Sequence, residues 1–232
     1  MTEIFYIIVW FGLVLSVIVD NLVVTSRFAA ASLNSNAIGS YLSQVLSLLS
    51  RLSVVLFLPF SALLIDLGAL TKDLIFLYFL CSVSMVIIIT LLYRNRSIFY
   101  HFFMVRVEKL LPNKTFQKNL IPRYIFKIAD IKHPLFIASF FVSSINLIGL
   151  TLPLIISSIY TDYSTFLSHL GGLINVSATL VNTFILEKRL SISFESSLKD
   201  DEILVLLVIS RIFAYLLVSI LFIIWYSNII TQ

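Results

Sequence analysis

Residues 203–226 read ILVLLVISRIFAYLLVSILFIIWY, an apolar run interrupted by one charged side chain, Arg211. A hydrocarbon layer about 30 Å thick is crossed by a helix of about 20 predominantly apolar residues. The run is long enough to make that crossing, and predominantly apolar stretches of this length are typical of transmembrane segments rather than of soluble domains. We therefore interpret it as a membrane span.

Five further apolar runs resemble this one, so the sequence predicts an all-α integral membrane protein with about six transmembrane helices. The spans are expected near 4–25, 38–65, 74–93, 135–160, 165–186 and 203–226, in a single polytopic membrane domain covering 1–232. Composition agrees, because 59% of the residues are hydrophobic and only 12% are charged, against roughly a quarter charged in soluble domains. Pro59 and Pro153 are expected to bend their helices. The third run carries no charge and is expected to face lipid.

The basic residues predict an orientation. Nine of the 16 Lys and Arg residues lie between Arg94 and Lys132, and short loops rich in Lys and Arg remain on the cytoplasmic side. If 94–133 is cytoplasmic, the short loops at Arg27 and at 187–202 are cytoplasmic too. Both termini then face outward, and we expect a multi-pass protein of the bacterial inner membrane. The positive charge is accordingly assigned to membrane lipids rather than to nucleic acid.

The loop between the third and fourth spans is too polar to cross the membrane, yet it contains a helical pattern. Its apolar residues fall on one face, and His101, Glu108 and Lys109 lie on the opposite face. The apolar set comprises Ile98, Phe99, Phe102, Phe103, Val107, Leu110 and Leu111. This pattern predicts a helix lying in the cytoplasmic interface, which serves either as a topology anchor or as a guide for an anionic lipid substrate.

Three ionisable residues, Asp20, Arg51 and Arg211, lie inside the predicted spans. Each costs about 2.5–3.5 kcal/mol on insertion scales, so each requires a partner, water or a function. One interpretation is a charged cavity that opens toward the cytoplasm, in which the forked donors of the arginines bind a pyrophosphate. The alternative is a structural ion pair between Asp20 and Arg51.

Uncharged polar residues recur at helical spacing in the same spans. The second span has Ser40, Ser43, Ser47 and Ser50 before Arg51, and the fifth has Ser168, Gly172, Asn175, Thr179 and Asn182. Each set forms a stripe along one side of a helix. Such stripes are typical of helix packing in membranes, but together with three charges they also suit the lining of a hydrated cavity.

Signatures of catalysis are missing from the sequence. The only adjacent glycines are Gly171 and Gly172, which is too few for a phosphate-binding loop. The three histidines, His101, His133 and His169, are far apart, and Cys81 is the single cysteine. We therefore expect neither an enzyme nor a bound cofactor or metal.

Two stretches resemble the Amj family, the alternate lipid II flippases of bacterial cell-wall synthesis. The first is DNLVVTSRFAAASLNSNAIGSYLSQVLSLLSRLSVVLFLPFSALLID, residues 20–66. It is similar to the family pattern of an acid at the end of the first helix, a Ser–Arg–x–Ala turn, and a second helix with an internal Ser–Arg and a final Asp. The matching residues are Asp20, Ser26, Arg27, Ala29, Ser50, Arg51 and Asp66.

The second stretch begins at Tyr160 and includes LSHLGGLINVSATLVNTFILEKRLS, residues 167–191. It resembles the fifth-helix signature of the family, through Leu167, Ser168, Ile174, Asn175, Ala178, Thr179 and Leu180. Where the family tends to have an acid followed by proline after this helix, the chain has Glu187, Lys188 and Arg189.

The resemblance implies a flippase that moves an undecaprenyl-pyrophosphate-linked sugar precursor of peptidoglycan, such as lipid II. The expected substrate-binding residues are Asp20, Arg27, Arg51, Asn175, Asn182 and Arg211. The alternatives are a flippase for another polyprenyl-linked glycan, a non-transporting scaffold of an envelope-synthesis complex and, third, a lipid-modifying enzyme. Expected partners are the lipid-linked glycan and membrane lipids. A homodimer is also expected, because six helices enclose little space for a large headgroup.

Overall fold

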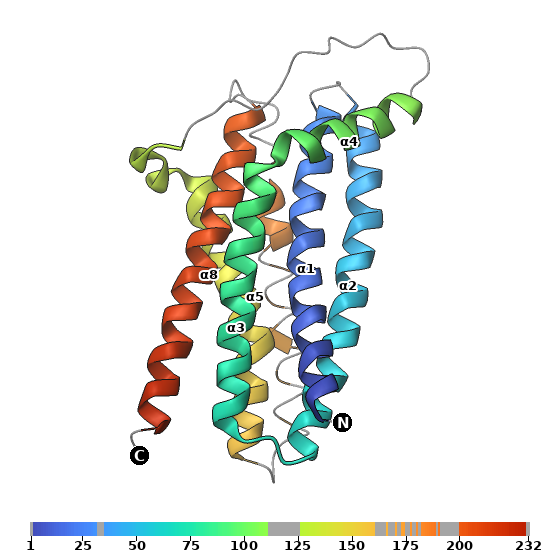
Figure 1. Cartoon of the computed structure of the whole chain (residues 1–232). Coiled ribbons are helices and arrows are strands. Elements are labelled where there is room, and N and C mark those ends of the chain that lie inside the picture. Colours follow the sequence, from blue (N-terminus) through green and yellow to red (C-terminus); the bar gives the residue numbers. More distant parts are fainter. Residues whose placement is uncertain are drawn as a thin grey trace.

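The computed structural model describes residues 2–31, 35–110, 126–160, 166, 170, 173–174, 177, 180, 182–188, 190 and 200–230, and its regular elements are all helical (Figure 1). The long helices are α1 (Thr2–Ala31), α2 (Asn36–Asp66), α3 (Thr71–Arg94), α5 (Pro134–Ile159) and α8 (Asp200–Ile230). The shorter elements are α4 (Arg96–Leu110), the 3₁₀ helix η1 (Ile128–Lys132) and the π-helical segment η3 (Asn182–Glu187).

Five of these helices are long and apolar enough to cross a membrane, which confirms an all-helical, multi-pass membrane protein. They are Thr2–Ala30, Ala37–Asp66, Thr71–Arg94, Pro134–Ile159 and Glu202–Ile229. Each contains or closely matches one of the predicted runs. The remaining prediction, a span near 165–186, falls largely outside the described residues.

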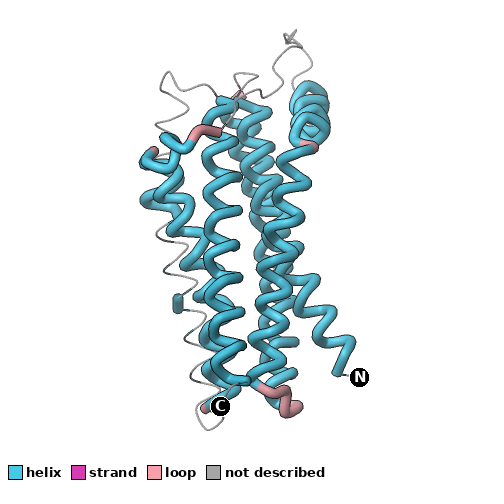
Figure 2. Tube along the Cα trace, turned by 60° about the vertical axis from the view of Figure 1, so that its left-hand side comes forward, coloured by secondary structure: helices cyan, strands magenta, loops and turns pink. Residues whose placement is uncertain are grey.

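The long helices run side by side: α1 and α3 run in one direction, and α2, α5 and α8 run in the other (Figures 1 and 2). The N- and C-terminal ends lie toward the same end of the bundle, and α4 crosses the opposite end. Helix α1 packs mainly on α2 and also contacts α3, α4 and α8, whereas α8 packs on α3 and α5. This arrangement brings α1 and α8, the first and last helices, into contact.

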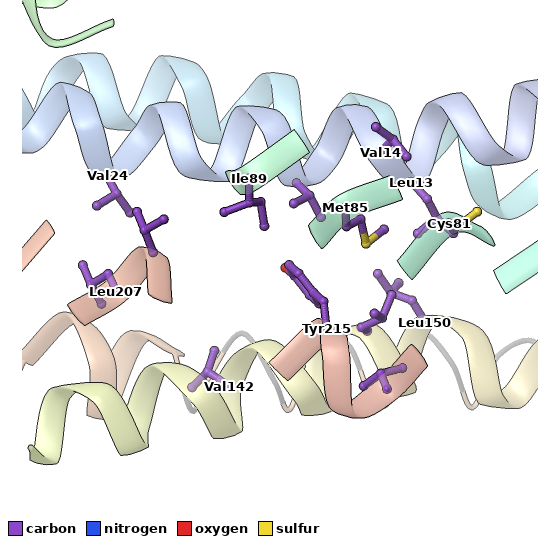
Figure 3. Packing of buried hydrophobic residues seen from close by; sticks show 14 of the residues in the cluster. Leu13, Val14, Val24, Cys81, Met85, Ile89, Val142, Leu150, Leu207 and Tyr215 are labelled. Carbon is purple, nitrogen blue, oxygen red and sulfur yellow. The ribbon is translucent and has the colours of Figure 1, made fainter. Parts of the chain in front are cut away.

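The apolar core lies between α1, α3, α5 and α8 (Figure 3). Helix α3 contributes Tyr78, Cys81, Met85 and Ile89, each with none of its surface exposed. The prediction that the uncharged third span faces lipid is therefore wrong for this side of the helix. An uncharged apolar helix suits lipid and protein neighbours equally, so the sequence does not distinguish the two environments.

Helix α4 packs against α1 through a face that overlaps the predicted one only in part, because Phe103 and Val107 belong to both faces. Tyr100, Phe103, Met104 and Val107 are buried, and the Tyr100 and Phe28 rings lie 5.2 Å apart. Ile98 and Phe102, assigned to the same apolar face in the sequence, are exposed. The aromatic residues of α4 are distributed around the helix, so the side that contacts α1 cannot be recognised from hydrophobicity alone.

Hydrogen bonds between side chains join several of the described helices. Ser219 of α8 donates to Ser82 of α3 at 2.8 Å, Trp10 donates to Ser84 at 3.1 Å, and Ser158 donates to Thr71 at 3.0 Å. Pro59 and Pro153 both lie inside continuous helices. Small polar residues here act as helix-packing groups, the role that the packing alternative assigned to them.

Candidate functional site between α1, α2 and α8

Close packing of α1 on α2 sets the geometry of the candidate site. A Cβ atom added to Gly12 would lie 3.1 Å from Phe57 Cβ and 3.2 Å from the Ser53 carbonyl oxygen. Nearer the other end of the contact, a Cβ atom on Gly39 would lie 2.8 Å from Ala30 Cβ. Glycine at these two positions allows the helices to approach closely along most of their length.

Asp20 lies on α1 between these two contacts. Its carboxylate accepts a side-chain hydrogen bond from Ser50 of α2 and is within electrostatic reach of Arg211 of α8. The side chain is partly exposed rather than buried. Asp20 therefore joins three helices, and its compensating charge is Arg211.

Arg211 has a neighbour one turn further along α8. Tyr215 lies within electrostatic reach of both Arg211 and Asp20, and its side chain points into the core beside Met85 (Figure 3). One terminal nitrogen of Arg211, Nη1, is buried and has no hydrogen-bond partner among the described residues. An unsatisfied guanidinium donor is costly to bury, so this nitrogen is a ready donor to an anion.

Arg51 follows Ser50 in the chain but points elsewhere. Its side chain is exposed on the outside of α2, away from the pair formed by Asp20 and Arg211. The structure thus brings two of the three predicted membrane charges together and leaves the third on the outer surface. The alternative of an ion pair between Asp20 and Arg51 is not observed.

A polar stripe on α2 leads from the end of the bundle to Arg51. Spacings of four, three and four residues place its members on one side of the helix. We call it the outer stripe: Ser40, Gln44 and Arg51, which are exposed, and Ser47, which is partly exposed. At 1.5 Å per residue, the stripe extends about 16 Å, roughly half of a hydrocarbon layer.

The outer stripe differs from the serine seam predicted for this helix. Ser43 is buried and donates to the Ser40 carbonyl at 2.8 Å, and Ser50 faces Asp20. Gln44, which the sequence analysis missed, belongs to the exposed set. Its spacing of seven residues from Arg51 was the signal that could have identified it.

The remaining predicted residues have separate positions. Arg27 is partly buried near the C-terminal end of α1, with its Cα atom 3.6 Å from the Cβ position of Gly39. Asn175 lies outside the described residues. Asn182 begins η3, which contacts α5, and only its backbone is described.

Among the described residues, no group of three His, Cys, Asp or Glu side chains is placed to hold a metal ion. Comparison with known proteins gives no assignment either, because no family model, characterised protein or solved structure matches the chain. The chemistry of the site is therefore defined by its own residues. It offers two guanidinium groups, one carboxylate and several hydroxyl and amide groups.

Proposed function

We propose that the protein is a flippase for a polyprenyl-pyrophosphate-linked sugar, of the lipid II type used in peptidoglycan synthesis. The observation that carries this proposal is the outer stripe of α2. It provides polar groups on the outer surface of a membrane helix, from Ser40 near the end of the bundle to Arg51 near the middle. A structural helix gains nothing from such a surface in lipid, where polar groups are costly.

The cost of moving a headgroup explains why such a stripe is useful. A sugar pyrophosphate that enters hydrocarbon loses its hydration without compensation. Serine and glutamine side chains along α2 replace part of that hydration, while the polyprenyl tail stays in the lipid beside the helix. The headgroup then meets Arg51, whose forked donors match a pyrophosphate.

Arg211 and Asp20 provide the next step of the proposed path. Arg211 has a buried donor without a partner, and Asp20 balances its charge when no headgroup is present. Asn175 and Asn182 are proposed to bond the sugar hydroxyls, and Arg27 to attract the phosphate groups at the cytoplasmic surface.

Reconstitution tests the proposal. Purified protein is placed in liposomes that hold a fluorescent polyprenyl-pyrophosphate sugar, and a membrane-impermeant quencher reports how much of it becomes accessible in the outer leaflet. We expect the accessible fraction to rise with protein and to fall with Arg51→Ala. Equal accessibility in protein-free liposomes would refute transport, and a comparison of two sugar headgroups separates lipid II from other glycans.

A scaffold function is the second candidate, favoured by the exposure of α2. The outer side of this helix presents Leu48, Leu52 and Val55, all exposed, and it is the least buried of the five spans. In a scaffold, this surface binds a helix of another protein and Arg51 pairs with an acidic residue there. Liposomes without transport activity, together with a stable membrane complex that Arg51→Glu disrupts, would favour this function.

A further inference from the structure

A cleft separate from the outer stripe opens between α1, the corner of α3 and α4, and α8. Its lining includes Arg96 and Phe99 of α4, the helix that crosses one end of the bundle (Figure 1). Its polar lining is Asn21, Thr25, Tyr93 and Arg96, and its α8 wall is Leu204 and Val208. The cleft is open to the exterior.

Asn21 gives the cleft a buried acceptor. The side chain is 4% exposed, and its amide nitrogen donates to the Val17 carbonyl at 2.8 Å. That carbonyl can only accept, so the nitrogen must face it and the oxygen must face away. Asn21 Oδ1 has no hydrogen-bond partner among the described residues, and the Thr25 hydroxyl is used on the Asn21 backbone carbonyl at 2.9 Å. Asn21 Oδ1 is therefore available to accept a hydrogen bond from a ligand in the cleft.

Arg96 gives the cleft a cation in a fixed position. Its guanidinium carbon lies 4.4 Å from the centre of the Tyr93 ring, and its Nη1 donates to the Tyr93 carbonyl at 3.3 Å. A guanidinium has five N–H donors, so it can keep such contacts and still bind a phosphate through its edge. The α8 wall is apolar, because it is formed by Leu204 and Val208, which are 2% and 7% exposed.

We propose that this cleft binds a lipid headgroup that carries a phosphate and a hydroxyl group. The phosphate contacts Arg96, the hydroxyl donates to Asn21 Oδ1, and the glycerol or prenyl carbons lie against Leu204 and Val208. A bulk phospholipid such as phosphatidylglycerol and a polyprenyl-pyrophosphate sugar share this chemistry. The proposal does not depend on transport, so it can fail or hold independently of the proposed function.

Native mass spectrometry of the purified full-length chain tests the proposal. The chain is mixed with phosphatidylglycerol, with phosphatidylmethanol, which has the same charge but no headgroup hydroxyl, or with phosphatidylcholine. We expect retention in that order, phosphatidylglycerol highest. Equal retention of the first two lipids would overturn the role of the hydroxyl, and equal retention of all three would overturn the site.

Competition then identifies the source of the headgroup. Displacement of phosphatidylglycerol by a polyprenyl-pyrophosphate sugar at lower concentration assigns the cleft to the lipid-linked sugar, and retention of phosphatidylglycerol assigns it to bulk lipid. Either result supports a lipid site. Displacement by inorganic phosphate alone at comparable concentration would overturn it, because the cleft would then bind free phosphate.

Two substitutions test the assigned contacts. Arg96→Gln should weaken phosphatidylglycerol retention about tenfold, the change expected for loss of a hydrogen bond to a charged group, while Arg94→Gln, an exposed arginine at the end of α3, should not. Asn21→Leu should abolish the preference for phosphatidylglycerol over phosphatidylmethanol. If Arg96→Gln fails to fold, Arg96→Lys keeps the charge and should still weaken retention. Unchanged retention in a folded Arg96 variant would overturn the proposal.

Discussion

Asp20 on α1 lies within electrostatic reach of Arg211 on α8, and Ser50 of α2 donates a hydrogen bond to the same carboxylate. The contact links helices that are first and last in the chain. It also leaves Arg51, the residue next to Ser50, exposed on the outer side of α2. The two arginines inside the membrane segments therefore have different environments and should respond differently to substitution.

Removing one partner of the pair formed by Asp20 and Arg211 should destabilise the protein. Breaking a fully buried ion pair costs about 3–5 kcal/mol. We expect roughly 1–3 kcal/mol for Asp20→Ala or Arg211→Ala, because both side chains are partly exposed to their surroundings. The double variant should recover most of the loss, since no uncompensated charge remains. Cys81 is fully buried, so a thiol-reactive dye added during heating in detergent reports unfolding.

Arg51→Ala is the matched control for this cycle. The Arg51 side chain is exposed and has no role in balancing the charge of Asp20. The unfolding temperature of the Arg51→Ala variant should therefore stay close to that of the native protein. A loss in Arg51→Ala that Asp20→Ala restores would instead show that Arg51 balances the carboxylate.

Arg51→Lys should reduce transport while leaving stability unchanged. Lysine keeps the positive charge but lacks the forked donors that bind a pyrophosphate, and we expect a loss of about tenfold or more in transport rate. The liposome assay measures the rate, and dye reactivity of Cys81 measures the fold. Leu52→Ala, on the neighbouring exposed position, is the control. Full transport by Arg51→Lys would remove the ligand role.

Much of the fold was predictable from the sequence because the requirement for apolar length is strict. The run at 203–226 became the middle of α8, and the run at 74–93 lies within α3. The side of each helix that faces the core was not predictable, because apolar residues such as Tyr78 and Met85, which are buried here, can contact either protein or lipid. The sequence therefore indicates where each helix begins and ends more clearly than which side of the helix faces the protein core.

The candidate site was predictable in part. Charge inside an apolar run is rare enough to identify Asp20, Arg51 and Arg211. Their pairing was not, because the sequence contains no information on which helices lie together. Tyr215 was missed for the same reason, although its spacing of four residues from Arg211 places it on the same side of α8.

The hydrogen bond between Ser219 and Ser82 should contribute modestly to stability. The oxygens are 2.8 Å apart and both side chains are buried, and such bonds in membranes average about 0.6 kcal/mol with a maximum near 1.7. We expect Ser219→Ala and Ser82→Ala to lower the unfolding temperature slightly, and the double variant to cost less than the sum. Strict additivity in this cycle would show that the two hydroxyls do not interact.

Gly12→Val should disrupt the packing of α1 on α2. A Cβ atom added at this position would lie 3.1 Å from Phe57 Cβ and 3.2 Å from the Ser53 carbonyl oxygen, and the two further methyl groups of valine would require the helices to separate. Overpacking of this kind costs about 1–3 kcal/mol. Phe11→Leu, at the exposed neighbouring position, should have little effect. Thermal unfolding distinguishes the two, and equal stability of both variants would mean that the contact is loose.

Single cysteines at the two ends of the bundle should report its orientation. Lys72 at the start of α3 and His101 on α4 are both exposed, and α4 crosses the end opposite to the termini (Figure 1). Nine of the 16 basic residues lie between Arg94 and Lys132, so the α4 end should be cytoplasmic. In a Cys81→Ser background, an impermeant maleimide should label Lys72→Cys in intact bacterial cells and should label His101→Cys only after permeabilisation. The reverse pattern would place the α4 end outside, and the start of the outer stripe would then face away from a substrate made in the cytoplasm.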